Sequence, residues 1–440
     1  MAAGMFDLIV RRVAIDGRDG SHDIAIAGER IAAIAPRLDA EAEVELDGED
    51  RLASPAFVQP HIHLDKALVG RRLPPNSSGT LAEAISLLHE SKRAATVEEI
   101  RERAGIVIRQ AVIAGTTTLR SHVDVDTIGG LRPLEGVAAA RADHADLCDI
   151  QIVAFPQEGI WRNPGTDELL IRAMRSGADL VGGMPHWESD HDAARRHIAF
   201  CLDLAVRHDA DVDMHVDETD DGRWHTFELL IDEAERRGWG ARTSAGHVCA
   251  MAAWEDGFAT AVIRRAATAG VKVITNPPTN LMLQGRGDAE PRRRGIPRIK
   301  ELLAAGVTVA AGQDCVEDAF YPFGTADPLQ VALIVAHAAQ LGTPSEIAAA
   351  LRMVGEDAAR VLRLPVYGLV PGARADLVVL DAAKPQEALR EQAPRRWVVC
   401  RGRIVAETIR EQRLHRSTSG HEASGGHCPP SPPAAAAAQA

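Results

Sequence analysis

The sequence lacks the features that mark several classes of protein. Its six cysteines lie far apart and include no Cys-x-x-Cys pair, which excludes a thiolate zinc knuckle and gives no disulfide framework. No apolar run approaches the length of a transmembrane helix. Positive charge is in deficit, with a net charge of −13, which argues against nucleic acid or an anionic membrane surface as a partner.

What remains is the composition of an ordinary globular enzyme, with 46% hydrophobic and 25% charged residues. The N-terminus shows no basic stretch followed by an apolar core, and the cysteines suit a reducing compartment, so we expect a cytoplasmic protein. At 440 residues the chain exceeds one ordinary core, so a large domain plus a smaller one is expected. A homo-oligomer is expected only because symmetric oligomers are common.

The middle of the chain alternates short apolar runs with helical segments, which is the pattern of parallel βαβ units. Segments such as Val97–Ala114 and Ile198–His208 carry apolar residues at three- and four-residue intervals. The pattern predicts an α/β fold, a closed (β/α)8 TIM-like barrel with its active site at the carboxyl ends of the strands. The expected strands are 56–63, 116–123, 150–155, 179–184, 211–216, 242–247, 271–276 and 307–314.

Both ends of the chain carry short alternating runs, separated near the N-terminus by Asp-Gly turns. We expect the two ends to complete one sheet in a small β-sandwich domain. The predicted boundaries are 1–54 and 365–412 for the small β-domain and 55–364 for the barrel.

The predicted tail, residues 413–440, is rich in Ser, Gly, Pro and Ala and cannot bury enough apolar surface to order itself. It is therefore expected to be disordered. Its residues His421, His427 and Cys428 are excluded from the functional site for this reason.

Polar residues end several of the expected barrel strands, and four of them suit a metal site. His61 and His63 are two residues apart, so both imidazoles point to the same face of a strand. A lone His-x-His pair is weak evidence, but His215 and Asp314 also lie at strand ends. Three imidazoles and one carboxylate suit Zn²⁺ or Fe²⁺ with a position open for water.

Three further residues are candidates for proton transfer or substrate contact. Glu218 follows His215 on the loop leaving its strand and would act as a proton shuttle. His247 ends a strand after small residues, where a hydrogen-bonded core histidine is an equally good interpretation. Gln157 offers an amide that matches a ring edge with adjacent carbonyl and N–H groups, although a loop-capping role is the simpler account.

The chain also resembles bacterial cytosine deaminase of the amidohydrolase superfamily, from about residue 5 to about residue 410. The resemblance rests on motifs that occur in the same order along both sequences. These motifs are His61–Asp65, Ser78–Leu81, Ser121–Val125, Ile152–Gly159, His215–Glu218, Leu283–Arg286 and Tyr321–Ala326.

The resemblance implies a metal-dependent hydrolytic deaminase of cytosine or a close aminated pyrimidine such as 5-methylcytosine. Metal-bound hydroxide would attack the amidine-like carbon, and ammonia would leave. The implied partner is a small heterocyclic substrate. The implied cofactor is one divalent metal ion, Fe²⁺ or Zn²⁺, bound by His61, His63, His215 and Asp314.

The resemblance also implies roles for the residues around the metal. Glu218 would protonate the ring nitrogen next to the attacked carbon, and His247 would hold and polarise the bound water. Asp314 would accept the proton of that water. Gln157 would bind the carbonyl edge of the pyrimidine, and the backbone of Leu81 would add a second contact.

Two residues depart from the family's pattern and bear on the choice of substrate. Cys315 stands where the family's second aspartate lies beside the ring. Because cysteine behaves as a small hydrophobe, we expect tolerance of a methyl group at carbon five. Phe320 stands where the family has tryptophan. This change removes the N–H donor of the indole and some of the area that could stack on a substrate ring.

Alternatives of three kinds remain from the sequence. Another exocyclic C–N bond could be the target, in isoguanine or in an N-alkylamino triazine such as isopropylammelide. The barrel could instead be a non-catalytic scaffold, although no ligand or proton shuttle is missing.

Met184-Pro185-His186 at the fourth strand, in place of a carboxylated lysine, disfavours ring opening of cyclic amides. His122 and His186 either line the pocket or orient a ligand.

Overall fold

The structure is a computed structural model that describes residues 5–78, 81–290 and 292–415, with the backbone alone for residues 81 and 82. Residues up to Thr408 belong to one compact unit, and the next unit begins at Ile409. Of the predicted tail, residues 413–415 are described and are irregular. The rest of the tail, with His421, His427 and Cys428, lies outside the described residues.

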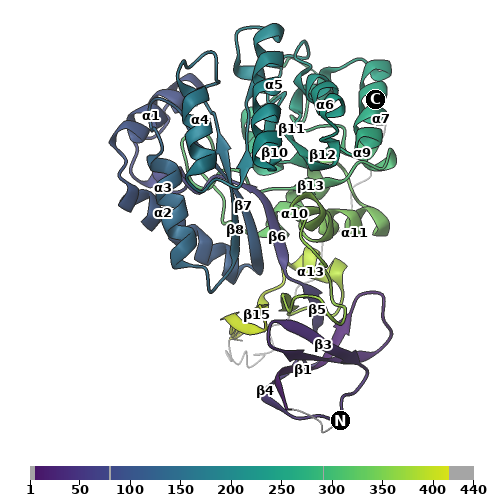
Figure 1. The fold of residues 1–440 in the computed structure, drawn as a ribbon. Helices are drawn as coiled ribbons and strands as arrows, with labels where there is room; N and C mark the ends of the chain where they lie inside the picture. Colours follow the sequence, from purple (N-terminus) through teal and green to yellow (C-terminus); the bar gives the residue numbers. More distant parts are fainter. Residues whose placement is uncertain (1–4, 79–80, 291, 416–440) are drawn as a thin grey trace, which may run out of the picture. The chain divides into compact units, whose positions relative to one another are not determined.

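Eight parallel strands form the central sheet and follow one another in chain order. A parallel bridge between Ile62 and Asp314 brings the last strand back to the first. The predicted (β/α)8 barrel is therefore confirmed (Figure 1). Its strands are β6 (Phe57–Ile62), β7 (Thr116–Asp124), β8 (Asp149–Phe155), β9 (Leu180–Val181), β10 (Asp211–Val216), β11 (Thr243–His247), β12 (Lys272–Thr275) and β13 (Val309–Ala311).

Helix α2 (Val97–Ile113) shows how the sequence places a helix on the barrel. Thr96 and Glu99 form a capping box that fixes its first turn, and Gly115 takes a positive φ of 93° just after its end. Apolar residues at three- and four-residue spacing face inward and are buried. These buried residues are Ile100, Ala104, Val107, Ile108 and Ala111.

The other helices follow the strands or cap their loops. None of the helices in the described ranges is long and apolar enough to cross a membrane. They are α1 (Leu81–Ala94), α3 (Arg132–Asp143), α4 (Thr166–Arg175), α5 (His191–His208), α6 (Thr226–Arg237), α7 (Asp256–Ala269), α8 (Pro277–Leu283), α9 (Ile299–Ala304), α10 (Pro328–Ala338), α11 (Pro344–Arg352), α12 (Glu356–Val361), α13 (Pro385–Glu391), and the 3₁₀ turns η1 (Val69–Arg71), η2 (Pro185–Trp187), η3 (Gly240–Arg242) and η4 (Cys249–Ala253).

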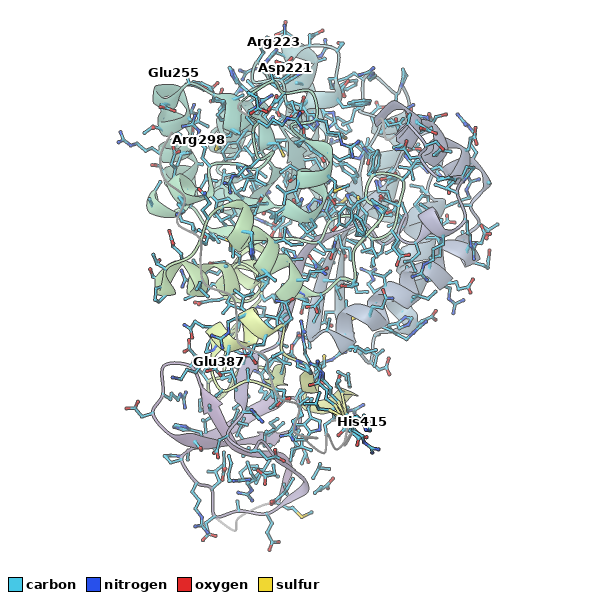
Figure 2. All side chains as sticks on the ribbon, turned by 180° about the vertical axis from the view of Figure 1, so that it is seen from behind. Asp221, Arg223, Glu255, Arg298, Glu387 and His415 are labelled. Carbon is cyan, nitrogen blue, oxygen red and sulfur yellow. The ribbon has the colours of Figure 1, made fainter. Side chains whose placement is uncertain are left out.

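Arginine side chains tie neighbouring helices together on the outside of the barrel. Arg298, which precedes α9, donates to the carbonyl oxygen of Trp254 at 2.6 Å and contacts Asp256 of α7 at 2.7 Å. Glu255 caps the start of α7, and Figure 2 shows it close to Arg298. On the loop after β10, Asp221 pairs with Arg223 at 2.6 Å. The contacts of Arg298 and Glu255 fix the start of α7, and the pair of Asp221 and Arg223 stays within its loop.

A second, mixed sheet is built from both ends of the chain, as the alternating runs predicted. The two ends meet where β5 pairs antiparallel with β14, with Leu377 opposite Pro55. Immediately after β5 the chain enters the barrel at β6. The strands of this sheet are β1 (Phe6–Ile15), β2 (Ser21–Ala27), β3 (Arg30–Ala35), β4 (Ala42–Asp47), β5 (Leu52–Pro55), β14 (Leu377–Leu380), β15 (Arg395–Cys400) and β16 (Arg403–Glu407).

Candidate metal centre and substrate cavity

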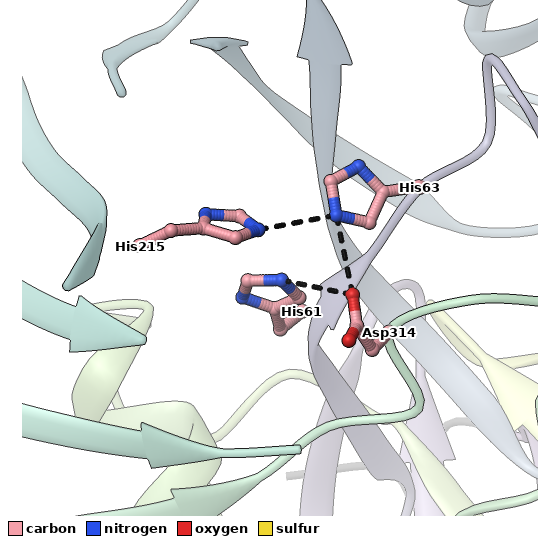
Figure 3. A group of neighbouring side chains, drawn as sticks. All are labelled: His61, His63, His215 and Asp314. Atoms are coloured by element: carbon pink, nitrogen blue, oxygen red, sulfur yellow. Dashed lines mark hydrogen bonds and ion pairs between the residues drawn. The ribbon is translucent and has the colours of Figure 1, made fainter. Parts of the chain in front are cut away.

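Four buried side chains meet at the carboxyl ends of three barrel strands (Figure 3). His61 and His63 come from the end of β6, His215 from β10 and Asp314 from the segment after β13. One potential ligand atom from each lies within 4.8 Å of all the others. Asp314 Oδ1 is 3.4 Å from His61 Nε2 and 3.2 Å from His63 Nε2. The structure thus brings together all four residues that the sequence singled out as metal ligands.

The backbone around this cluster is closely packed. Asp314 has a positive φ of 66°, in the left-handed region that aspartate enters more readily than most residues. Its N–H donates to the carbonyl oxygen of His61 at 2.9 Å, and its own carbonyl accepts from the N–H of His63 at 3.1 Å. A Cβ at Gly312 would lie 2.7 Å from the Cβ of His61, so only glycine fits there.

The protonation states of His63, His215 and Asp314 suit a cation. Burial lowers the pKa of His63 to about 3 and the pKa of His215 well below its ordinary value. Burial by itself would raise the pKa of Asp314, but the neighbouring histidines hold that pKa well below its ordinary value. Neutral imidazoles and an ionised carboxylate are the forms that bind metal ions. The donor set therefore fits one divalent cation.

Glu218 and His247 lie beside this cluster. Glu218 Oε1 is 3.3 Å from His247 Nδ1, and burial followed by the charge of Asp314 raises the pKa of Glu218 well above its ordinary value. His247 has a φ of 70°. Its ring nitrogens lie 3.1 Å from Asn276 Nδ2 and 2.9 Å from Asn280 Nδ2. His247 is thus held in one orientation by two amides.

A cavity of about 690 Å³ opens above the cluster. It contains most of the candidate residues for chemistry and substrate contact, although they come from widely separated segments. Leu81 is the first residue of α1, its side chain lies outside the described part of the chain, and its substrate contact stays a prediction. The candidates that line the cavity are His63, Gln157, His215, Glu218, Asp314, Cys315 and Phe320.

The two histidines of uncertain role take different positions. The ring of His122 stacks on His61 with centroids 4.0 Å apart, and its Nε2 lies 3.4 Å from Asp213. Arg120 pairs with Asp213 at 2.8 Å inside the barrel. His122 therefore packs against His61, one of the predicted metal ligands. His186 lines the cavity itself, and burial lowers its pKa to about 3.

The sequence interpretation missed several residues of the site. Asn276 and Asn280, which contact His247, follow the seventh barrel strand, and a pair of amides at a strand end was the available signal. Lys66 lines the cavity beside Gln157. It directly follows the motif His61–Asp65, so its position was visible although its contact was not.

Comparisons with known proteins agree with this geometry. The amidohydrolase family matches residues 44–406. N-isopropylammelide isopropyl amidohydrolase of Pseudomonas sp. (strain ADP) is 31% identical over 91% of this chain and 98% of its own length. Pterin deaminase of Rhizobium rhizogenes is 30% identical over 89% of each chain. The structure of 5-methylcytosine deaminase from Klebsiella pneumoniae liganded with 5-fluorocytosine has a TM-score of 0.88 and 35% identity, and covers 92% of this chain and 99% of that one.

A (β/α)8 barrel with polar side chains gathered at the carboxyl ends of its strands is typical of the class of barrel enzymes. Within that class, this chain belongs to the amidohydrolase family. It is a hydrolase that acts on C–N bonds, which sets aside the non-catalytic scaffold.

Proposed function

We propose that this protein is a metal-dependent hydrolytic deaminase of cytosine or a close aminated pyrimidine such as 5-methylcytosine. The observation that carries the proposal is that one cavity brings Gln157, Glu218 and Cys315 together above the cluster of His61, His63, His215 and Asp314. The likeness to a 5-methylcytosine deaminase over nearly the whole chain supports it.

The proposed ligands of a single Fe²⁺ or Zn²⁺ ion are His61, His63, His215 and Asp314. Such an ion, when bound, lowers the pKa of a water molecule in its open position and supplies the nucleophile. The side chain of His122 supports His61 by stacking against it. Backbone hydrogen bonds join Asp314 to both His61 and His63.

The protein's own residues would move the protons. Burial and the charge of Asp314 raise the pKa of Glu218 well above its ordinary value, which favours the protonated carboxyl that can donate a proton to the ring nitrogen beside the attacked carbon. Asp314 is ionised and can accept a proton from the attacking water. His247, held by its two asparagines, lies close to Glu218 and orients it. In total, water replaces the amino group by an oxygen, and ammonia leaves.

Three residues would bind the ring. Gln157 would contact its carbonyl edge, and Phe320 would cover one face. Burial raises the pKa of Cys315 well above its ordinary value, so its side chain is a neutral thiol. A neutral thiol leaves room for a methyl group at carbon five without an unpaired charge beside it. The backbone of Leu81 would add a further contact.

The test is ammonia release from purified, metal-reconstituted protein with cytosine, 5-methylcytosine and isoguanine in parallel. Release from either pyrimidine supports the proposal, and the ratio of the two rates reports on Cys315. Absence of release from both pyrimidines, with metal bound, would remove them as substrates.

A second candidate is hydrolysis of the alkylamino group of a triazine such as isopropylammelide. It is favoured by the 31% identity with an N-isopropylammelide hydrolase and by a cavity volume larger than a bare pyrimidine needs. Isopropylamine release, followed by chromatography in the same experiment, separates the two candidates.

A further inference from the structure

The side-chain amide of Gln157 is held in the cavity by Lys66, which contacts the amide oxygen. Lys66 Nζ donates to Gln157 Oε1 at 2.7 Å, and Gln157 Nε2 donates to Met184 Sδ at 3.3 Å. An ammonium group has donors and no acceptor. Lys66 therefore admits only the orientation in which the amide oxygen faces it. The second N–H of the amide is left for a group inside the cavity.

Lys66 itself is held by buried charges. Its Nζ lies 3.0 Å from Asp124 Oδ1, and the other oxygen of Asp124 lies 2.8 Å from Lys92 Nζ. Lys92 also contacts Asp126 at 2.6 Å. Burial alone would lower the pKa of Lys66, but the charges of Asp124 and Asp65 raise the pKa above its ordinary value. The ammonium is therefore charged and cannot turn into an acceptor.

In the wall formed by Lys66 and Gln157, Lys66 occupies one lone pair of Gln157 Oε1, and the N–H groups that Lys66 and the Gln157 amide leave for the cavity are donors. Among the described residues, the Lys66 ammonium has two hydrogen-bonding partners, Asp124 and Gln157, and it lines the cavity. Its third N–H and the second N–H of the Gln157 amide remain for a ligand. A ring oxygen can accept from both. An amino group or a C–H in the same place would leave both donors unpaired, and a buried unpaired donor is costly.

We infer that Lys66 is a positioning and specificity-determining residue, which fixes the Gln157 amide so that this wall accepts a ring oxo group and rejects an amino group or a C–H. The inference rests on the proposed function, because it takes the ligand to be a heterocycle in the cavity above the metal cluster. It narrows the substrate class to aminated heterocycles that carry an oxo group beside the ring nitrogen next to the attacked carbon.

Ligand binding without turnover tests this selection. The probes are uracil, which carries the second oxo group, and 4(3H)-pyrimidinone, which has a C–H in its place. Calorimetric titration of the metal-reconstituted protein should show uracil bound at least about tenfold more tightly. In Lys66→Met the ratio should fall to within about twofold of one, because the Gln157 amide is free to turn. In this variant Asp124 keeps Lys92 as a partner.

A second variant covers the case in which Lys66→Met does not fold. In Gln157→Glu the carboxylate pairs with Lys66 and presents an acceptor to the ring, so the preference for uracil should be lost. The matched control is Arg162→Met, which removes a positive charge from the same cavity. The native Arg162 contacts Trp187 and makes no hydrogen bond to Gln157 in the described residues. The control variant should keep the preference of the unmodified protein.

The outcomes separate the inference from the proposed function. Equal binding of the two probes by the unmodified protein, binding of neither, or a preference that persists in both the Lys66 and Gln157 variants would overturn the inference. A preference for uracil that depends on Lys66, without ammonia release from any pyrimidine, would instead overturn the proposed function alone.

Discussion

The Nε2 atoms of His63 and His215 face each other at 3.2 Å in the interior of the barrel. Burial lowers the pKa of both rings, so both are neutral. Only one of the two facing nitrogens can donate to the other, and Asp314 Oδ1 lies a further 3.2 Å from His63 Nε2. A cation between these atoms would accept one lone pair from each of them at once.

Removal of the metal should therefore destabilise the protein. Because an ion that binds only the folded state adds to its stability, chelation should lower Tm by several degrees, and Zn²⁺ or Fe²⁺ should restore it. Differential scanning fluorimetry measures the shift. His215→Asn should have a low Tm that does not respond to chelator. An equal response of this variant would mean that the ion binds elsewhere.

Glu218→Gln should bind metal normally and lose turnover by roughly 10²- to 10⁴-fold, because the amide keeps the shape of the side chain but cannot transfer a proton. Metal content is measured by elemental analysis and turnover by ammonia release. Near-normal turnover would exclude Glu218 as the proton shuttle.

Cys315→Asp should shift the preference from 5-methylcytosine toward cytosine. A carboxylate beside carbon five needs hydrogen bonds or water that a methyl group displaces. The measurement is the ratio of kcat/KM for the two pyrimidines, and an unchanged ratio would assign that edge of the ring to another residue. Cys201→Ser, a buried cysteine on α5, serves as the control for loss of a thiol.

Gly312→Ala should weaken metal binding and lower the free energy of unfolding by about 1–3 kcal/mol. The new methyl group would lie 2.7 Å from the Cβ of His61 and 2.6 Å from Asn276 Oδ1, so the histidine has to move. Gly342→Ala is the matched control, since nothing lies within 4 Å of its added Cβ. Equal metal affinity in both variants would contradict the packing argument.

Glu188→Gln should lower the free energy of unfolding at pH 7 by roughly 1.5–3 kcal/mol. The Glu188 carboxylate accepts from the N–H groups of Ile160, Trp161 and Arg162 and from His197 Nδ1. Burial raises its pKa, but these hydrogen bonds lower the pKa by more, so the net pKa lies below the ordinary 4.5.

A lowered carboxylate pKa gives stability that is complete above pH 4.5 and is lost as pH falls through the pKa of the folded state. The difference between the unmodified protein and Glu188→Gln should therefore be constant from pH 7 to about pH 5 and shrink below that. Urea denaturation at several pH values measures it. A difference that grows toward acid pH would contradict this account.

The barrel and the cluster of candidate metal ligands could be predicted because both follow from local order in the sequence. Several barrel strands, such as β8 and β12, are short runs rich in apolar residues. In a closed parallel barrel the strand ends meet on one face, so His61, His63, His215 and Asp314 were expected to lie close together. Even β9, with only two residues, fell within its predicted range.

The contacts of the cavity wall could not be predicted in the same way. Lys66 meets Gln157 across 91 positions of the chain, and the side-chain directions that join them depend on packing rather than on sequence period. The position of Asn276 and Asn280 at a strand end was visible in the sequence, but nothing local marks their amides as partners of His247. Contacts of this kind depend on which side chains come close in the folded structure, and the local sequence pattern does not show that.

The closure of the barrel also bears on how the protein is made. The bridge between Ile62 and Asp314 joins the first barrel strand to the last, and the proposed metal ligands lie on both sides of it. A growing chain on the ribosome has the three histidines long before the aspartate emerges. Full metal loading therefore has to wait until synthesis of the barrel is almost complete, and a truncated chain would leave the histidines without their carboxylate.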